Sequence, residues 1–142
     1  MCRSGGAPFD RGAKGRKPAR QRKDQVMKYL LMICDQEKQW ADMSEAQRGT
    51  IHAEYGKFTA DIKKSGNWIA GQALQPTNTA TTIRVREGKT LTTHGPFAET
   101  REQLGGFYLV EAKNLDEATA IAARIPSAKM GSIEVRPILD VG

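Results

Sequence analysis

The chain has 142 residues, enough for one compact domain with a single core, and a formal net charge of +6. The charge is unevenly placed, because residues 1–26 carry eight basic and two acidic groups while the rest of the chain carries 14 of each. The rest of the chain therefore lacks the basic surface that DNA binding requires, and no apolar run approaches membrane-spanning length. Nucleic acid is expected as a partner only through residues 1–26, and a membrane is not expected.

Residues 1–26 form a tail that is rich in Gly, Arg and Lys and nearly free of apolar side chains. Such a segment buries too little surface to offset its ordering entropy, so we expect it to be disordered and the domain to span 27–142. Three explanations for the tail stay open: translation that begins at Met27, a fusion artefact, or a basic arm for nucleic acid or anionic lipid. The two cysteines, Cys2 and Cys34, show no disulfide or zinc spacing, which favours reduced thiols in a cytoplasmic protein.

The first half of the domain reads as strand, helix, strand. The continuous apolar run 29–33 predicts a strand that is buried on both faces. Ser44 and Gln47 have the spacing of a capping box and predict the start of a helix that runs to about residue 64 and is stopped by Gly66. The apolar stripe of this helix consists of Ile51, Tyr55, Phe58 and Ile62. A second strand follows over about 68–74.

The second half begins with a hairpin, because residues 79–86 alternate and a Glu-Gly-Lys turn leads into a short strand over 90–93. An irregular loop, 94–105, then precedes an apolar strand over 107–111. Asn114 caps a helix that Pro126 prevents from continuing. A last alternating strand covers 132–137.

This order predicts an α+β fold of the ferredoxin-like, split βαβ type, with an antiparallel sheet of about five strands and both helices on one face. Two helices cover only one face of such a sheet. The runs 29–33 and 107–110, however, place bulky apolar side chains on both faces. Leaving these side chains in water would forfeit several kcal/mol at about 25 cal/mol per Å². We therefore expect a homodimer in which two copies pack sheet to sheet around a two-fold axis.

The loop 94–105 is the favoured place for chemistry, because it joins ionisable side chains to a buried strand. A histidine exchanges protons near neutral pH, so one hypothesis is a small acid–base pocket. Its catalytic residues are His94, Tyr55 and Glu99, and its ligand-binding residues are Phe97, Arg84 and Glu102. The competing interpretation is a solvated loop in which Thr100 and Gln103 start one helical turn. No nucleotide, dinucleotide or zinc-hydrolase signature is present, and no cofactor or metal is expected.

The stretch 94–112 resembles the signature of the YCII-related, DGPF-type family, which runs Asp-Gly-Pro-Phe, Ala-Glu-Thr-Lys-Glu and Gly-Gly-Phe/Tyr. Here it reads His-Gly-Pro-Phe-Ala-Glu-Thr-Arg-Glu-Gln-Leu-Gly-Gly-Phe-Tyr. Further similarity lies at 27–31, 71–86, 123–126 and 133–137, so that the resemblance covers about 27–139.

The resemblance implies a dimeric α/β barrel. In the broader group, a His and an Asp meet in a cleft and suggest enzymatic work. That pair does not carry over to this chain, because His94 stands at the position of the motif's Asp and Tyr55 at the helical position that often holds the His.

Two functional hypotheses follow. The first is a cytoplasmic homodimer that binds a small molecule in a cleft near loop 94–105, with possible acid–base activity. The alternative is a non-enzymatic interaction module that regulates transcription by acting on a sigma factor, since some family members resemble accessory proteins of transcription. An enzyme should show a closed pocket with convergent polar groups, and an interaction module an exposed apolar patch beyond the dimer contact.

Overall fold

The computed structural model describes residues 26–140 of the chain. The predicted tail therefore lies outside the described residues except for Val26. In chain order the elements are β1 (Met27–Asp35), α2 (Glu37–Ala41), α3 (Glu45–Lys64), β2 (Trp68–Ala73), the 3-10 turn η1 (Thr77–Thr79), β3 (Thr81–Arg86), β4 (Lys89–His94), β5 (Gln103–Ala112), α4 (Leu115–Ala123), the 3-10 turn η2 (Pro126–Lys129) and β6 (Ser132–Pro137).

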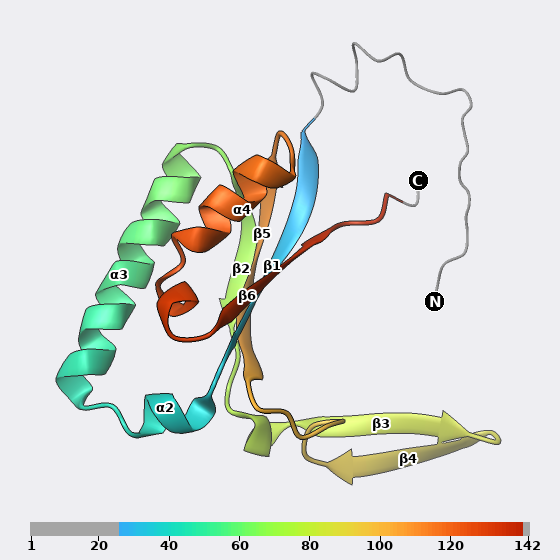
Figure 1. Cartoon of the computed structure of the whole chain (residues 1–142). Helices are drawn as coiled ribbons and strands as arrows, with labels where there is room; N and C mark the ends of the chain where they lie inside the picture. Colours follow the sequence, from blue (N-terminus) through green and yellow to red (C-terminus); the bar gives the residue numbers. More distant parts are fainter. Residues whose placement is uncertain (1–25, 141–142) are drawn as a thin grey trace, which may run out of the picture.

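Four strands form an antiparallel sheet in the order β2-β5-β1-β6, and the helices lie together on one of its faces (Figure 1). This arrangement confirms the predicted α+β, ferredoxin-like fold. The sheet is narrower than expected, because β3 and β4 form a separate two-stranded ribbon instead of joining it. Pro76 and η1 turn the chain away from the end of β2, and Gly95, with φ of 109°, turns it back toward β5.

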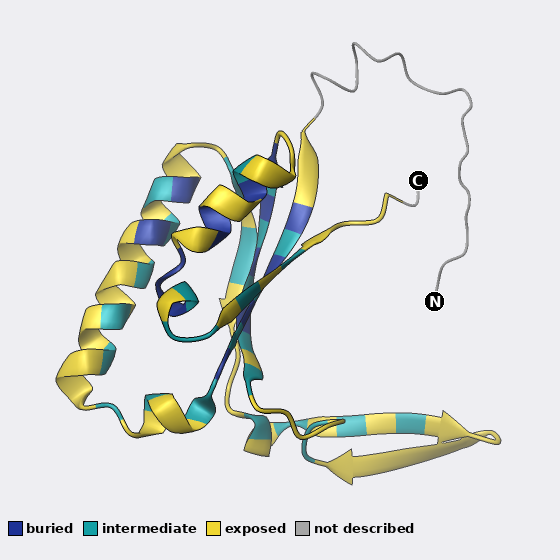
Figure 2. Ribbon diagram, viewed as in Figure 1, coloured by how far each residue is buried: buried dark blue, intermediate teal, exposed yellow. Residues whose placement is uncertain are grey.

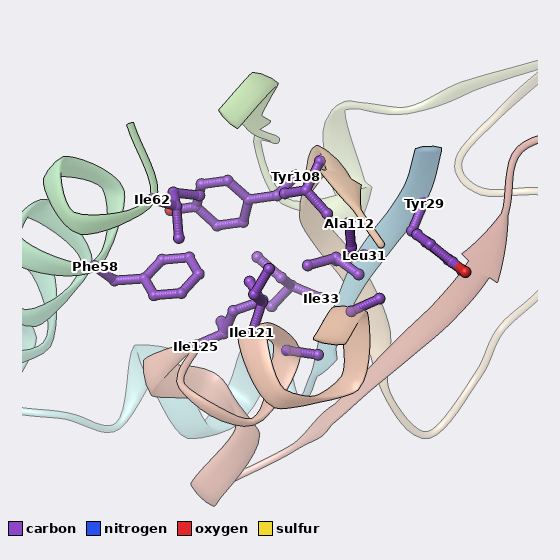
Figure 3. Packing of buried hydrophobic residues seen from close by; sticks show 12 residues of the cluster. Tyr29, Leu31, Ile33, Phe58, Ile62, Tyr108, Ala112, Ile121 and Ile125 are labelled. Atoms are coloured by element: carbon purple, nitrogen blue, oxygen red, sulfur yellow. The ribbon is translucent and has the colours of Figure 1, made fainter. Parts of the chain in front are cut away.

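The core lies between the sheet and the helices α3 and α4. Leu31 of β1, Val110 of β5 and Ile62 of α3 are fully buried there. Phe58 of α3 meets Tyr108 of β5 edge to face, with ring centroids 5.1 Å apart, and Figure 3 shows the two rings on the α3 side of the cluster. These contacts fasten the C-terminal half of α3 to the sheet.

The two faces of the sheet differ in cover. On β1, Leu31 and Ile33 point under the helices, whereas Leu30 and Met32 are half-buried on the opposite face. Leu30 pairs with Leu109 of β5 and Met32 pairs with Phe107, and these two partners are also half-buried on the opposite face. We call the surface formed by Leu30, Met32, Phe107 and Leu109 the open sheet face.

Local signals in the sequence explain where α3 and α4 begin. Ser44 forms the predicted capping box, in which its hydroxyl accepts a hydrogen bond from the amide of Gln47 and its own amide donates to the Gln47 side chain. Asn114 caps α4 as predicted. The suggested helical turn at residues 100–103 is wrong: the Thr100 hydroxyl donates to the carbonyl of Glu102, and Gln103 already begins β5. The short helix α2 was not predicted.

Candidate functional site

A cavity of about 710 Å³ lies between the N-terminal half of α3 and the end of the sheet where β1 and β2 finish and β5 begins. Helix α2 and the segment after β2 close its sides. This volume falls in the range that holds small-molecule ligands. We call it the α3–sheet cavity.

Glycines keep the floor of this cavity open. Gly71 of β2 and Gly105 and Gly106 of β5 all line it. A side chain has no room at Gly106, because an added Cβ would lie 2.9 Å from the carbonyl oxygen of Gln72. The Gly-Gly pair of the sequence motif therefore lets two strands approach closely and leaves a hollow where side chains would otherwise fill the space.

Asp35, the last residue of β1, is the buried acidic group of the cavity. It is only 4% exposed, and its Oδ2 accepts a hydrogen bond of 2.9 Å from the indole N–H of Trp40. Among the described residues, Trp40 supplies the one hydrogen bond found for this carboxylate. A carboxylate has room for about four donors, so Asp35 brings unused acceptor capacity to the cavity wall.

Helix α2 owes its position to contacts with distant parts of the chain. The Glu37 carboxylate accepts hydrogen bonds from the amide and the hydroxyl of Thr77, at 2.7 and 2.8 Å, and the Glu37 amide donates to the side chain of Gln103. Arg48 of α3 donates to the carbonyls of Trp40 and Met43, each at 3.1 Å. These contacts hold α2 against the cavity and bring Trp40 to Asp35.

Helix α3 contributes a row of polar side chains to the opposite wall. The imidazole of His52 stacks on the Trp40 ring, with centroids 5.8 Å apart, at the exposed rim. One turn further along, the Tyr55 hydroxyl donates a 2.6 Å hydrogen bond to the fully buried Ser127. Burial raises the pKa of Tyr55, the bond to Ser127 offsets part of this rise, and the nearby charge of Asp35 adds to it. Tyr55 therefore stays protonated at neutral pH.

The structure separates most of the predicted site residues from Tyr55. His94 ends β4 and pairs with Thr81, exposed and outside the cavity lining. The lining likewise omits Glu99, Phe97, Glu102 and Arg84, and Phe97 is 79% exposed. Loop 94–105 contributes only its last residue, Gly105, to the cavity. The predicted trio of His94, Tyr55 and Glu99 is not brought together within one chain.

Sequence reasoning missed Asp35, Trp40, Arg48, His52 and Ser127 as residues of the cavity wall. A carboxylate directly after a buried apolar strand was a usable signal for Asp35, because strand ends often carry polar site residues. The others had no local signal, since they reach the cavity through tertiary contacts.

Within residues 26–140, no group of three or more His, Cys, Asp or Glu side chains is placed to hold a metal ion. The same part of the chain contains no helix that combines the length and apolar character needed to cross a bilayer.

Two comparisons with known proteins bear on this site. The family model of the YCII-related domain matches residues 27–141, which include every residue of the cavity. A protein of Rhizobium meliloti (strain 1021), described as uncharacterised, is 39% identical over 114 residues, covering 79% of this chain and 92% of that protein.

Proposed function

The chain belongs to the YCII-related family, and we propose that it binds a small organic molecule in the α3–sheet cavity. The observation that carries this proposal is Asp35, a carboxylate that is 4% exposed, faces a cavity of about 710 Å³ and has one hydrogen-bond donor among residues 26–140. Its Oδ2 is hydrogen-bonded to Trp40, whereas no described residue donates to its Oδ1, and most buried side-chain polar atoms have a partner. A ligand that brings O–H, N–H or cationic groups to Asp35 provides such a partner.

The cavity wall also defines the rest of the ligand. Trp40 and Trp68 line it together with aliphatic side chains, so a flat apolar body fits beside them. A ligand that presents a carboxylate to Asp35 would be repelled. The preferred class is therefore a phenol, an aromatic amine or a similar small molecule with an apolar frame and a donor group.

The same geometry supports proton transfer on a bound substrate. Asp35 is the candidate base, because a carboxylate with free lone pairs faces the cavity. The Tyr55–Ser127 pair on the facing wall is the candidate proton donor, and the raised pKa of Tyr55 keeps its proton in place at neutral pH. His52 stacks on Trp40 at the rim of the cavity. In this proposal His94 and Glu99 take no part in the reaction.

Intrinsic fluorescence tests the binding proposal directly, because both tryptophans of the chain line the cavity. Phenols and aromatic amines should change this fluorescence saturably, and matched aromatic carboxylates should bind more weakly. Asp35→Asn should weaken binding of the first group at least tenfold. Asp42→Asn is the matched control, because Asp42 lies outside the cavity and pairs with Lys38 on the surface.

The binding proposal fails if Asp35→Asn and wild type bind the whole panel equally, or if no panel member binds and native mass spectrometry finds no co-purifying small molecule. The proton-transfer step has its own readout. If wild type catalyses the exchange of a carbon-bound hydrogen of a bound phenol or amine for deuterium from solvent, Asp35→Asn should abolish this exchange.

We also propose that the protein is a homodimer formed through the open sheet face. Leu30 and Leu109 form one cross-strand pair and Met32 and Phe107 another, and by strand alternation they point away from the face on which the helices lie (Figure 1). Burying such side chains contributes about 1.5–3 kcal/mol each. Sedimentation equilibrium should show a dimer at micromolar concentration, and Leu109→Arg should convert it to a folded monomer. A wild-type monomer at 100 μM would refute this.

A further inference from the structure

The ribbon of β3 and β4, residues 81–94, stands away from the body of the molecule. Figure 1 shows it leaving the end of the sheet toward the side opposite α3 and α4. Its extensive contacts are between its own two strands. At its base, the amide of Gly95 donates to the carbonyl of Ala80 at 2.7 Å, and the Thr82 hydroxyl donates to the carbonyl of Gly95 at 2.8 Å. We call this ribbon the β3–β4 arm.

The arm has two chemically different faces, because successive strand residues point to opposite sides and directly paired residues point to the same side. The pairs Thr81–His94, Ile83–Thr92 and Val85–Thr90 make up one face, which carries no Lys, Arg, Asp or Glu. We call it the neutral face. The pairs Thr82–Thr93, Arg84–Leu91 and Arg86–Lys89 make up the other, the basic face.

The neutral face carries exposed apolar side chains of the kind that protein contacts bury. Ile83 is 55% and Val85 58% exposed, and threonines lie opposite both of them. Figure 2 shows the arm almost entirely exposed or half-buried along its length. An isolated two-stranded ribbon is marginally stable in water. A β-branched, uncharged face on such a ribbon indicates a protein surface that covers it.

We propose that the neutral face of each arm packs on a second copy of this chain, beside the open sheet face. This inference rests on the proposed dimer and adds the arm to it. The arm projects on the side of the sheet where the second copy would lie, so sheet and arm face the partner together. In a two-fold dimer each copy both extends an arm and receives one.

The area that a stable dimer must bury also supports a second copy of the chain as the partner of the arm. A four-stranded sheet about 19 Å wide and 20 Å long offers a face of about 400 Å². Stable interfaces bury about 800 Å² per partner, so the open sheet face alone is small. The arm's face is about 20 Å long and 10 Å wide. Each copy would bury its open sheet face, the neutral face of its own arm and the surface that the partner's arm covers. These areas add up to about 800 Å² per partner, which is the size of a standard interface.

The distribution of charge fits this placement. Interface centres are depleted of charged residues, and their rims are polar. The neutral face and the apolar centre of the open sheet face meet the first condition. Arg84, Arg86 and Lys89 all lie on the basic face, which stays in water at the rim when the neutral face is buried.

The experiment compares the two faces of the arm in the full chain. Ile83→Asp and Val85→Asp place a charge on the neutral face, whereas Leu91→Asp places the same charge on the basic face at a side chain that is 47% exposed. Sedimentation equilibrium from 1 to 100 μM should show a dimer dissociation constant raised at least tenfold by each of the first two. Leu91→Asp should leave it within threefold of wild type. Circular dichroism establishes that each variant is folded.

Hydrogen exchange in the wild type gives an independent measurement. Amides of residues 81–94 should exchange more slowly at 100 μM than after dilution below the dissociation constant. If Ile83→Asp and Val85→Asp dimerise like wild type and the arm exchanges at one rate at both concentrations, the arm proposal is overturned. In that case Leu109→Arg still tests the open sheet face. A wild-type monomer at 100 μM overturns both proposals, whereas the ligand assays on Asp35 test the cavity separately.

Discussion

The indole N–H of Trp40 donates a 2.9 Å hydrogen bond to the carboxylate of Asp35, five residues earlier in the chain. Asp35 ends the first strand, and Trp40 lies on the short helix that follows it. This bond ties the helix that closes the cavity to the acidic group on the cavity wall. The stability of α2 and the environment of Asp35 are therefore linked.

Trp40→Phe should lower the free energy of unfolding by about 1–3 kcal/mol, because it leaves a buried carboxylate without its donor while retaining an aromatic ring. The same substitution in an Asp35→Asn background should cost less, since a neutral amide loses less when it is unpaired. Urea denaturation of the four proteins in this double-mutant cycle gives the coupling energy. We expect at least about 1 kcal/mol, and a value near zero would mean that the bond does not matter to stability.

Gly131→Ala should destabilise the protein by about 1–3 kcal/mol through overpacking. An added Cβ would collide with the carbonyl oxygen of Cys34 and lie 2.6 Å from the Cβ of Asp35. Gly49→Ala is the matched control: this glycine lies in α3 with nothing within 4 Å of an added Cβ, so the change should stabilise by about 0.5–1 kcal/mol. Thermal unfolding of the two variants should show shifts of opposite sign. Equal shifts would contradict the close approach at Gly131.

Much of the fold was predictable because its signals are local. The capping box of Ser44 and Gln47 fixed the start of α3, and the apolar run 29–33 fixed β1. Helix α2 was missed because it has five residues and no side-chain cap on Gln36, so its stability comes from the contacts of Glu37 with Thr77 and of Trp40 with Asp35. Pattern reasoning along the chain does not detect such contacts.

The candidate site was predictable only in part, for the same reason. Tyr55 was named, and the Gly-Gly pair of the motif proved to form the cavity floor. His94 was assigned to the same pocket because loop 94–105 joins it to β5. The ribbon leaves the sheet, however, and carries His94 away with it. Asp35 reaches the cavity through the order of the strands, which separate local patterns do not specify.

The protein should lose stability in alkali. Burial raises the pKa of the Tyr55 hydroxyl and of the Tyr108 hydroxyl, whereas unfolded tyrosines ionise near about pH 10. Above that pH the unfolded chain holds fewer protons than the folded chain. Stability from these groups is therefore fully present below about pH 10 and is lost as the pH rises through the folded values.

Urea midpoints measured from pH 8 to 11 check this expectation. Tyr55→Phe should reduce the fall of the urea midpoint above pH 10, because one of the two phenols is removed. Burial also raises the pKa of the Cys34 thiol, so a Cys34→Ser background separates its effect from that of the tyrosines. Absorbance at 295 nm should show two native phenols that ionise later than in the unfolded chain, and simultaneous titration in both states would exclude the effect.

Arg48→Met should loosen the wall of the cavity. The guanidinium donates to the carbonyls of Trp40 and Met43 and so fastens α2 and the turn after it to α3. Hydrogen bonds from charged groups contribute about 1.5–3 kcal/mol, and part of this should appear as lost stability. The more specific result is faster hydrogen exchange of the amides in residues 37–43, together with weaker binding of phenols detected by tryptophan fluorescence. Lys57→Met removes the same charge from α3 at an exposed ion pair with Asp61, so it should change stability by about 0.5 kcal/mol or less. If both variants leave exchange in residues 37–43 at the wild-type rate, α2 is held by Glu37 and Trp40 alone.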